Sequence, residues 1–366
     1  MQRRTTLIGA LASTALVALV ATGCAAAPDD APTDSTGGSD FLACAASDVT
    51  GFHDGDFNEL SLDGVTEAAD EVGAQVKTAE SSGEDQYVSS IGSLVDEGCQ
   101  FIVTVGFALA SATRDSAKAN PDVNYALIDS VVTNDDFSTL VMDNVKPVLF
   151  DTAQAAVLAG YLSAGATTTG TVATYGGMPF PSVTIFMDGF ADGIDYYNEK
   201  HGTSVKLLGW DKGSQNGSFV GSFDDQLAAK TITEGFLDQG ADIVMPVAGT
   251  LYGASLEAIK GRGVPAAIVG VNSDVFERSP ADGAYFLTSV MKNLTTATHE
   301  VTLAAAKGQF DNTPYIGTLE NGGVGIAPTH DWEAKLPKEL LAEVDQLQAD
   351  IISGAFTVDS PSSPKL

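Results

Sequence analysis

FIVTVGFALASATRDSAKANPDVNYALI, residues 101–128, is the clearest fold signal in the chain. Residues 101–105 and 124–128 are short apolar runs typical of buried strands, and residues 109–117 between them have the spacing of an amphipathic helix. A strand, a helix and a second strand in this order predict a βαβ unit. In such a unit two parallel strands are joined by a helix that covers one face of their sheet.

The same alternation continues along most of the chain. It predicts two runs of four strands, separated near residues 145–150, and therefore two similar α/β lobes with parallel sheets. The expected strands are 42–47, 74–78, 101–105, 124–128, 170–175, 204–208, 242–247 and 266–271. The expected helices are 59–72, 86–97, 109–117, 147–164, 182–198, 226–239 and 252–260.

Beyond residue 271 the alternation is less regular. The elements expected there are a strand at 284–290, a helix at 295–307, a hairpin-like pair at 315–319 and 324–326, and a helix at 338–353. The predicted parts are an N-terminal lobe of residues 41–146 plus about 273–312, a C-terminal lobe of residues 147–272 plus about 313–355, and a tail of residues 356–366. Three chain crossings would then form a hinge between the lobes. We expect a ligand cleft there, at the carboxyl ends of the strands.

The first 24 residues predict secretion. Two arginines precede an apolar run at residues 7–20, which is too short for a stable membrane span, and small residues then lead into Cys24. This predicts a signal peptide at residues 1–23 and a lipidated Cys24, although Ala21 stands where a lipobox usually has a large aliphatic residue. An ordinary cleaved signal with an incidental cysteine is the alternative. Residues 24–40 contain no large apolar side chain, so we expect a flexible leash there.

The net charge limits the class of partner, and the number of cysteines indicates the redox compartment. The chain has 48 acidic and 18 basic side chains, and a formal net charge of -30 argues against nucleic acid or anionic lipid as a partner. Solubility outside the cell or adaptation to salt would account for most of this charge. With Cys24 assigned to the lipid, Cys44 and Cys99 remain. They form either one disulfide between neighbouring strands or two buried free thiols.

A loop with ligand-binding chemistry follows the first expected strand. It carries Asp48 at the strand end, and Phe57 and Asn58 at the start of a helix. The carboxylate can accept hydrogen bonds from sugar hydroxyls or ring N–H groups, and the aromatic ring offers a stacking face. The alternative is that Phe57 is a core aromatic and Asp48 a loop cap.

The acidic residues of the same loop do not fit a calcium site. Asp54, Asp56 and Asn58 have the spacing of the first calcium ligands, but Glu59 stands at the glycine position and Val65 at the position of the last ligand. We therefore expect no metal in this loop.

The loop resembles the signature of the basic membrane protein family of lipoproteins, which are nucleoside-binding components of ABC transporters. That signature has an Asp at a strand end, a Gly-rich turn and Ser-Phe-Asn entering a helix. Asp48, Phe57 and Asn58 keep this spacing, and Asp56 replaces the Ser. Further segments match in order at residues 105–107, 121–129, 175–179, 186–193, 221–225, 239–242, 248–250, 270–274 and 288–293.

The resemblance implies a periplasmic-binding-protein-like class I fold and a set of ligand contacts. A nucleoside base would lie between Phe57 and Phe223, one from each lobe. The other implied ligand-binding residues are Asp48, Asn58, Asp129, Gly249, Asn272, Asp274 and Lys292.

Three of these implied contacts carry alternatives. The family usually has Asp where this chain has Asn272, so ribose recognition is either altered or carried by the Asn272 acceptor. A surface lysine is the alternative for Lys292, and a helix N-cap is the alternative for Asp129.

Enzyme motifs give no support for catalysis. The chain has no G-x-S-x-G, H-E-x-x-H, P-loop or G-x-G-x-x-G motif, and of its four histidines His53 is expected nearest to the cleft. The resemblance implies a lipid-anchored, extracytoplasmic and monomeric solute-binding protein without a cofactor. It would capture purine or pyrimidine nucleosides and deliver them to an ABC permease and its ATPase. The alternatives are a sugar-binding or signal-binding protein that feeds a sensor, and a nucleoside hydrolase that uses the aspartates of the loop.

Overall fold

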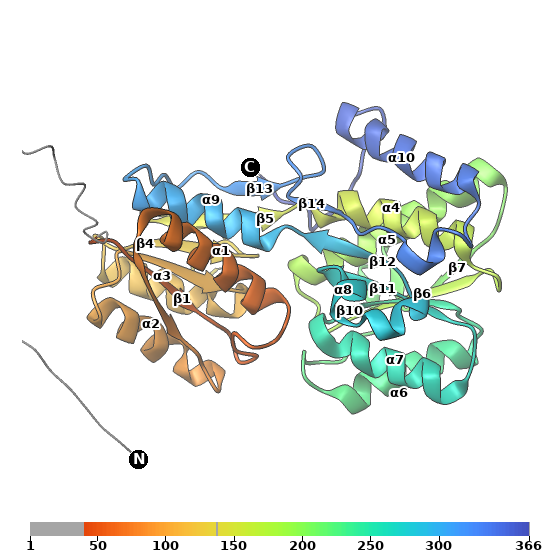
Figure 1. The fold of residues 1–366 in the computed structure, drawn as a ribbon, viewed down its shortest axis with the longest axis horizontal. Helices are drawn as coiled ribbons and strands as arrows, with labels where there is room; N and C mark the ends of the chain where they lie inside the picture. The colour runs from red at the N-terminus through yellow and green to blue at the C-terminus, as the bar shows by residue number, and fades with distance from the viewer. Residues whose placement is uncertain (1–39, 137, 366) are drawn as a thin grey trace, which may run out of the picture. The chain divides into compact units, whose positions relative to one another are not determined.

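The computed structural model describes residues 40–136 and 138–365. Residues 38–366 form one compact unit that contains two six-stranded sheets and a small two-stranded one (Figure 1). The predicted signal peptide and lipidated Cys24 lie outside the described residues, as does all of the leash except Asp40. Within the described residues, no helix combines the length and apolarity that a membrane span requires.

The first sheet is entirely parallel. Its strands, in spatial order, are β13 (Tyr315–Gly317), β5 (Val145–Phe150), β4 (Asn124–Ile128), β3 (Phe101–Val105), β1 (Leu42–Ala46) and β2 (Gln75–Ala79). The helices that cover one face are α1 (Phe57–Val72) and α9 (Leu294–Ala306), and those on the other face are α2 (Tyr87–Asp96) and α3 (Ala110–Ala119). Both faces are therefore buried, which explains the continuous apolar runs of these strands.

The second sheet is parallel except at one edge. Its strands, in spatial order, are β14 (Val324–Ile326), β12 (Phe286–Lys292), β11 (Ala267–Asn272), β10 (Ile243–Val247), β6 (Thr171–Gly176) and β7 (Lys206–Leu208), with β14 antiparallel to β12. One face is covered by α4 (Thr152–Ala166) and α5 (Pro181–His201), and the other by α6 (Gln226–Asp238) and α7 (Tyr252–Arg262). The helix α10 (Lys338–Ser353) packs on the outside of α4. The short helix α8 (Val275–Arg278) follows β11, and β8 (Trp210–Asp211) pairs with β9 (Asn216–Gly217).

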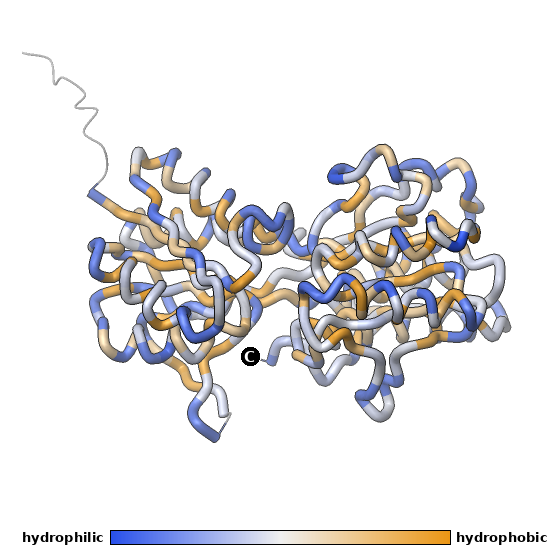
Figure 2. Tube along the Cα trace, turned by 90° about the horizontal axis from the view of Figure 1, so that it is seen from below, coloured by the Kyte–Doolittle hydropathy of each residue, from blue (hydrophilic) through white to orange (hydrophobic). Residues whose placement is uncertain are grey.

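Hydropathy follows this layering. Figure 2 shows apolar residues along the strands and hydrophilic residues in many of the surface loops. Each lobe therefore consists of a sheet with a layer of helices on either face. The prediction of two lobes with parallel sheets is confirmed.

The chain crosses between the two sheets three times, after β5, after β12 and after β13. The first crossing follows β5, which ends at Phe150, a few residues beyond the predicted boundary at 146. The second predicted boundary does not match the second sheet. Residues 273–293 were expected in the N-terminal lobe, whereas β12 is hydrogen-bonded to β11 within the second sheet. The chain returns to the first lobe only with α9, which packs on α1.

The helix expected at residues 147–164 begins later than predicted. Residues 145–150 form β5, in which Pro147 lies opposite Leu127 of β4, and α4 starts at Thr152. The helix α4 is buried on nearly all sides, so it has no polar stripe. The apolar run therefore passes from strand into helix without a change of pattern, and the periodicity could not mark the boundary.

The hairpin expected at residues 315–326 is not formed. β13 pairs with β5 in the first sheet, and β14 pairs with β12 in the second, so the segment between them is a crossing. Asn321 holds this crossing, because its side chain accepts from the Thr318 and Gly323 N–H groups and donates to the Ile316 carbonyl. An Asn-Gly-Gly sequence serves such a bend as well as it serves a hairpin turn.

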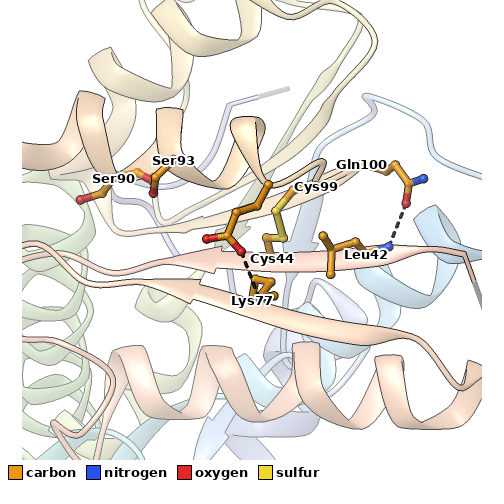
Figure 3. The surroundings of a disulfide bond; sticks show 8 residues. Leu42, Cys44, Lys77, Ser90, Ser93, Cys99 and Gln100 are labelled. Atoms are coloured by element: carbon orange, nitrogen blue, oxygen red, sulfur yellow. Dashed lines mark hydrogen bonds and ion pairs between the residues drawn. A yellow bond between two sulfur atoms is a disulfide. The ribbon is translucent and has the colours of Figure 1, made fainter.

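Cys44 in β1 and Cys99, just before β3, are joined by a disulfide (Figure 3). β1 and β3 are neighbouring parallel strands with Ala43 opposite Phe101, and the two cysteine Cα atoms lie 6.0 Å apart. Both cysteines are buried. The structure therefore holds one bridge in the first lobe in place of two free thiols.

Candidate functional site

The carboxyl ends of strands from both sheets meet around one pocket. β1, β3 and β4 approach it from the first lobe, and β10, β11 and β12 from the second. Its lining residues are Asp48, Thr50, Asp54, Asp56, Phe57, Asn58, Gly106, Phe107, Asp129, Ser182, Val183, Phe186, Phe223, Val247, Gly249, Thr250, Val271, Asn272 and Lys292. The position agrees with the expectation that ligands bind beyond the carboxyl ends of parallel strands.

The loop after β1 places a buried amide side chain in the pocket wall. Asn58 is only 1% exposed, and its amide nitrogen donates to Asp48 Oδ1 at 3.0 Å, Thr50 Oγ1 at 2.7 Å and Asp54 Oδ2 at 3.1 Å. This leaves Asn58 Oδ1 buried without a hydrogen-bond partner in the structure. A buried acceptor of this kind is favourable only if a ligand or a water donates to it.

The start of α1 is capped from within the same loop. Asp54 accepts hydrogen bonds from the backbone N–H groups of Asp56, Asn58 and Glu59. These groups would otherwise be unsatisfied at the helix N-terminus. The capping holds Phe57 and Asn58 in place at the first turn, where both side chains line the pocket.

A buried ion pair also lines the pocket. The ammonium of Lys292, at the end of β12, contacts the carboxylate of Asp129, which follows β4, and their side chains are 3% and 8% exposed. Lys292 Nζ also lies 5.0 Å from the Phe186 ring centroid and 5.6 Å from that of Phe57. Burial raises the pKa of the Asp129 carboxyl, and the Lys292 charge opposes that rise. Lys292 is therefore not a surface lysine.

Asp129 does not have the role of an N-cap either. It has a φ of 60° and is followed by a loop, and no described helix begins beside it. Its backbone conformation directs the chain away from β4 at the pocket wall. The carboxylate is thereby available to Lys292 of the other sheet.

Aromatic rings reach the pocket from both lobes. Phe57 comes from the first lobe and Phe223 from the second, and Phe107 contacts Phe223 with ring centroids 6.2 Å apart. Gly177 makes room for Phe223, because a Cβ at that position would lie 2.4 Å from the ring. Phe107 and Phe186 were not predicted as site residues, although both lie in segments that carried the family resemblance.

Asp274 differs from its predicted role. It is not part of the pocket lining, and both of its oxygens are engaged elsewhere. One accepts from the Phe276 N–H at the start of α8, and the other lies 2.6 Å from His330 Nε2. All the other predicted ligand residues line the pocket, and their contacts with a ligand stay predictions.

One group of three described side chains could hold a metal ion, and it lies outside the pocket lining. Within the described residues, Asp274, Glu277 and His330 are close enough together to share an ion, but none of them lines the pocket. His53, the histidine expected nearest to the cleft, is exposed and does not line it. The hydrolase alternative relies on the aspartates of the loop, and Asp48, Asp54 and Asp56 do line the pocket. Among the described residues, however, these three do not form a group close enough together to share an ion.

Hydrogen-bond acceptors outnumber donors on the pocket wall. Four aspartates and the free oxygen of Asn58 line it, and Lys292, the one lysine or arginine among the described lining residues, is paired with Asp129. Such a surface attracts a ligand that donates hydrogen bonds and repels an anion. Rings from both lobes add stacking faces for a flat group.

Comparison with known proteins agrees with this geometry. The family model described as "ABC transporter substrate-binding protein PnrA-like" matches residues 41–360. The ABC transporter nucleoside-binding protein BmpA of Lactococcus lactis subsp. cremoris is 25% identical, over 98% of this chain and all of the relative. Basic membrane protein A of Borreliella burgdorferi is 27% identical, over 84% of this chain and 85% of the relative.

Solved structures show the same fold. A solute-binding protein of an ABC transporter system from Aeropyrum pernix superposes with a TM-score of 0.75 at 24% identity, and covers 87% of this chain and 94% of its own. A similar solute-binding protein from Conexibacter woesei has a TM-score of 0.65 at 19% identity, and covers 88% of this chain and all of its own.

Proposed function

Because the chain belongs to the Bmp family of PnrA-like ABC transporter substrate-binding proteins, we propose that it binds purine or pyrimidine nucleosides between its lobes. In this role it captures the ligand outside the cell and passes it to an ABC permease that an ATPase drives. It is a carrier without catalysis of its own. The L. lactis relative is named as a nucleoside-binding protein, which supports this choice of ligand.

The observation that carries the proposal is the unpartnered oxygen of Asn58. Its amide nitrogen is held by three oxygen acceptors, so the oxygen must face the other way. Leaving a buried acceptor unpaired costs about 1–3 kcal/mol. A nucleoside offers N–H groups on its base and hydroxyl groups on its ribose, and either can donate to this oxygen.

Ring stacking and charge narrow the ligand class further. Phe57 and Phe223 provide faces from the two lobes, and a base stacked on such a ring gains about 1–3 kcal/mol. The acidic wall disfavours phosphate, since the lysine that could bind it is already paired with Asp129. The pocket therefore suits nucleosides better than nucleotides.

The proposed localisation rests on the N-terminal sequence. A signal peptide at residues 1–23 and an acylated Cys24 would hold the protein on the outer side of the cell membrane, and residues 25–40 would act as its leash. We propose that it works there as a monomer.

Isothermal calorimetry tests the proposal. The compact unit, residues 38–366, is unfolded and refolded to remove copurified ligand, and is then titrated with five nucleosides, with adenosine monophosphate, and with ribose and glucose. We expect saturable 1:1 binding of at least one nucleoside in the nanomolar to micromolar range, about -8 to -12 kcal/mol. The monophosphate should bind more weakly.

Two variants connect any binding to this pocket. Phe57→Ala and Asn58→Ala remove a stacking face and the free acceptor, so each should weaken binding. Glu67→Gln changes an exposed residue on the same helix and serves as the control. Heat released with a sugar alone, or with none of these compounds, would show that the ligand is not a nucleoside.

A further inference from the structure

Asp56 occupies an unusual position for an aspartate at a helix start. It is the N-cap residue of α1, but its side chain makes no capping hydrogen bond, because Asp54 caps the helix instead. It is nevertheless 4% exposed and lines the ligand pocket. A buried carboxylate that does not cap its own helix needs partners from elsewhere.

Those partners all come from the other lobe. Asn272 Nδ2, at the end of β11, donates to Asp56 Oδ2 at 2.8 Å, and Ser273 Oγ donates to Asp56 Oδ1 at 2.8 Å. An Arg278 guanidinium nitrogen from α8 lies 4.0 Å from Asp56 Oδ1. Asp56 thus joins the loop of the first lobe to β11 and α8 of the second.

The backbone on both sides is shaped for this contact. Asn272 has a φ of 66°, a conformation that few residues other than glycine adopt at low cost. Gly55 has the same φ, and a Cβ there would lie 2.8 Å from Arg278 Nη1. A side chain at position 55 would therefore displace the end of the Arg278 side chain, and the positive φ also favours glycine there.

The four residues form one group that bridges the lobes at the edge of the pocket. We call it the clasp: Asp56, Asn272, Ser273 and Arg278. Opening the cleft would break every contact of the clasp and return the Asp56 carboxylate to water. Closing the cleft would reverse this, so the clasp can form only where the two lobes are in contact.

We propose that the clasp sets the closure of the ligand cleft and that closing it takes up a proton. The contacts of the clasp need no ligand, whereas its effect on nucleoside affinity rests on the proposed function. Acid should therefore favour the closed arrangement, and neutral pH should leave the cleft more open.

The pKa of Asp56 supports the expectation that acid favours the closed arrangement. Burial raises the pKa of Asp56 to about 6, and Asp54 adds to the rise, while Asn272, Arg278 and Ser273 oppose it. The other charged groups of the surroundings are Asp63 on α1, which acts on Arg278, and Asp48, Asp129 and Lys292 around the pocket. In the open form a solvated carboxyl has its ordinary value of 3.8. The ratio of closed to open molecules should then rise about tenfold from pH 7 to pH 5.

Distance measurements without ligand test the clasp. Spin labels are attached at Val88→Cys on α2 and Leu227→Cys on α6, which are 65% and 74% exposed and lie in different lobes. Double electron–electron resonance on residues 38–366 measures the distance between the two spin labels. The distance distribution gives the populations of closed and open molecules between pH 5 and pH 7.5. The native disulfide leaves no other free thiol in the described residues.

Substitutions predict different results in this experiment. Asp56→Asn mimics the protonated carboxyl, so the closed fraction should be high and independent of pH. Asn272→Asp places a second carboxylate 2.8 Å from the first, so the cleft should open at pH 7 and close more steeply on acidification. Asp70→Asn removes an exposed carboxylate from the same helix and should behave like the parent protein.

The outcomes separate this proposal from the proposed function. A pH profile of Asp56→Asn equal to that of the parent would overturn the clasp, as would an Asn272→Asp variant that closes normally at pH 7. A protein that follows these predictions but binds no nucleoside would retain the clasp and lose the proposed ligand. Where a nucleoside does bind, its affinity should gain the same tenfold between pH 7 and pH 5.

Discussion

Lys292 and Asp129 form a buried ion pair between the ends of β12 and β4, and so connect the second sheet to the first within the ligand pocket. Each charge is compensated by the other and hardly by water, because neither side chain is more than 8% exposed. Buried pairs of this kind add little net stability, but the loss of one partner leaves a charge without compensation.

Removing the lysine should therefore destabilise the protein. We expect Lys292→Met to lower the free energy of unfolding by about 3–5 kcal/mol, because Asp129 then stays buried without a cation. Urea denaturation measures this loss. Lys118→Met, at an exposed lysine of α3, is the matched control. Equal stability of the two variants would mean that Asp129 is not charged in the folded protein.

The contribution of the Phe223 ring to ligand binding can be tested without changing an aromatic residue. In Gly177→Ala the added Cβ would lie 2.4 Å from the Phe223 ring and must displace it. Nucleoside binding should weaken about tenfold or more, as expected for the loss of one stacking face. Gly92→Ala provides the control, since no atom lies within 4 Å of a Cβ there. Unchanged affinity in Gly177→Ala would place the base away from Phe223.

The disulfide should contribute strongly to the stability of the first lobe. Cys44 and Cys99 are 55 residues apart, and closing a loop of that length stabilises a fold by about 4 kcal/mol in the chain-entropy view. Replacement of both cysteines by alanine should lower the urea midpoint accordingly. Nucleoside affinity should be nearly unchanged, since neither cysteine lines the pocket. The parent protein under a strong reductant should lose stability by a similar amount.

Asp56 should also make stability depend on pH. Its folded pKa of about 6 lies above the ordinary value of 3.8, so the folded chain binds more protons than the unfolded chain between these values. While the cleft stays closed, this contribution is favourable in acid and is lost between pH 3.8 and about 6, by at most about 3 kcal/mol, because opening of the cleft would let Asp56 ionise in water instead. Asp56→Asn should therefore be more stable than the parent at pH 7.5, and the difference should vanish near pH 4. Thermal melting across this range measures both curves, and parallel curves would contradict the assignment.

Regular alternation made most of the fold predictable. The central strands β1, β3, β4, β10 and β11 lie within one residue or so of their expected positions, because each is a short apolar run between helices. β5 was missed because it runs into α4, which is buried all round. The three-residue strands β13 and β14 were located, but their partners are set by distant strands that local sequence does not reveal.

The site was predictable where a residue follows a strand end. Asp48, Phe57 and Asn58 line the pocket for that reason, whereas Lys292 is implied only by the family resemblance. The clasp was not predictable, since Asp56 and Asn272 are 216 residues apart. Each had been noted separately as a departure from the family pattern, and only the fold brings the two departures into contact.

The three crossings have a consequence for the order in which the protein can fold. Synthesis proceeds from the N-terminus, and the first lobe obtains α9 and β13 only after β12 of the second lobe has been made. Until then, one face of the first sheet lacks α9, and the edge at β5 lacks its neighbour. The second lobe in turn waits for β14 and α10, the last elements of the chain. Neither half can be finished while the other is still emerging, so the two lobes complete their sheets and helical layers only after α10 has been made.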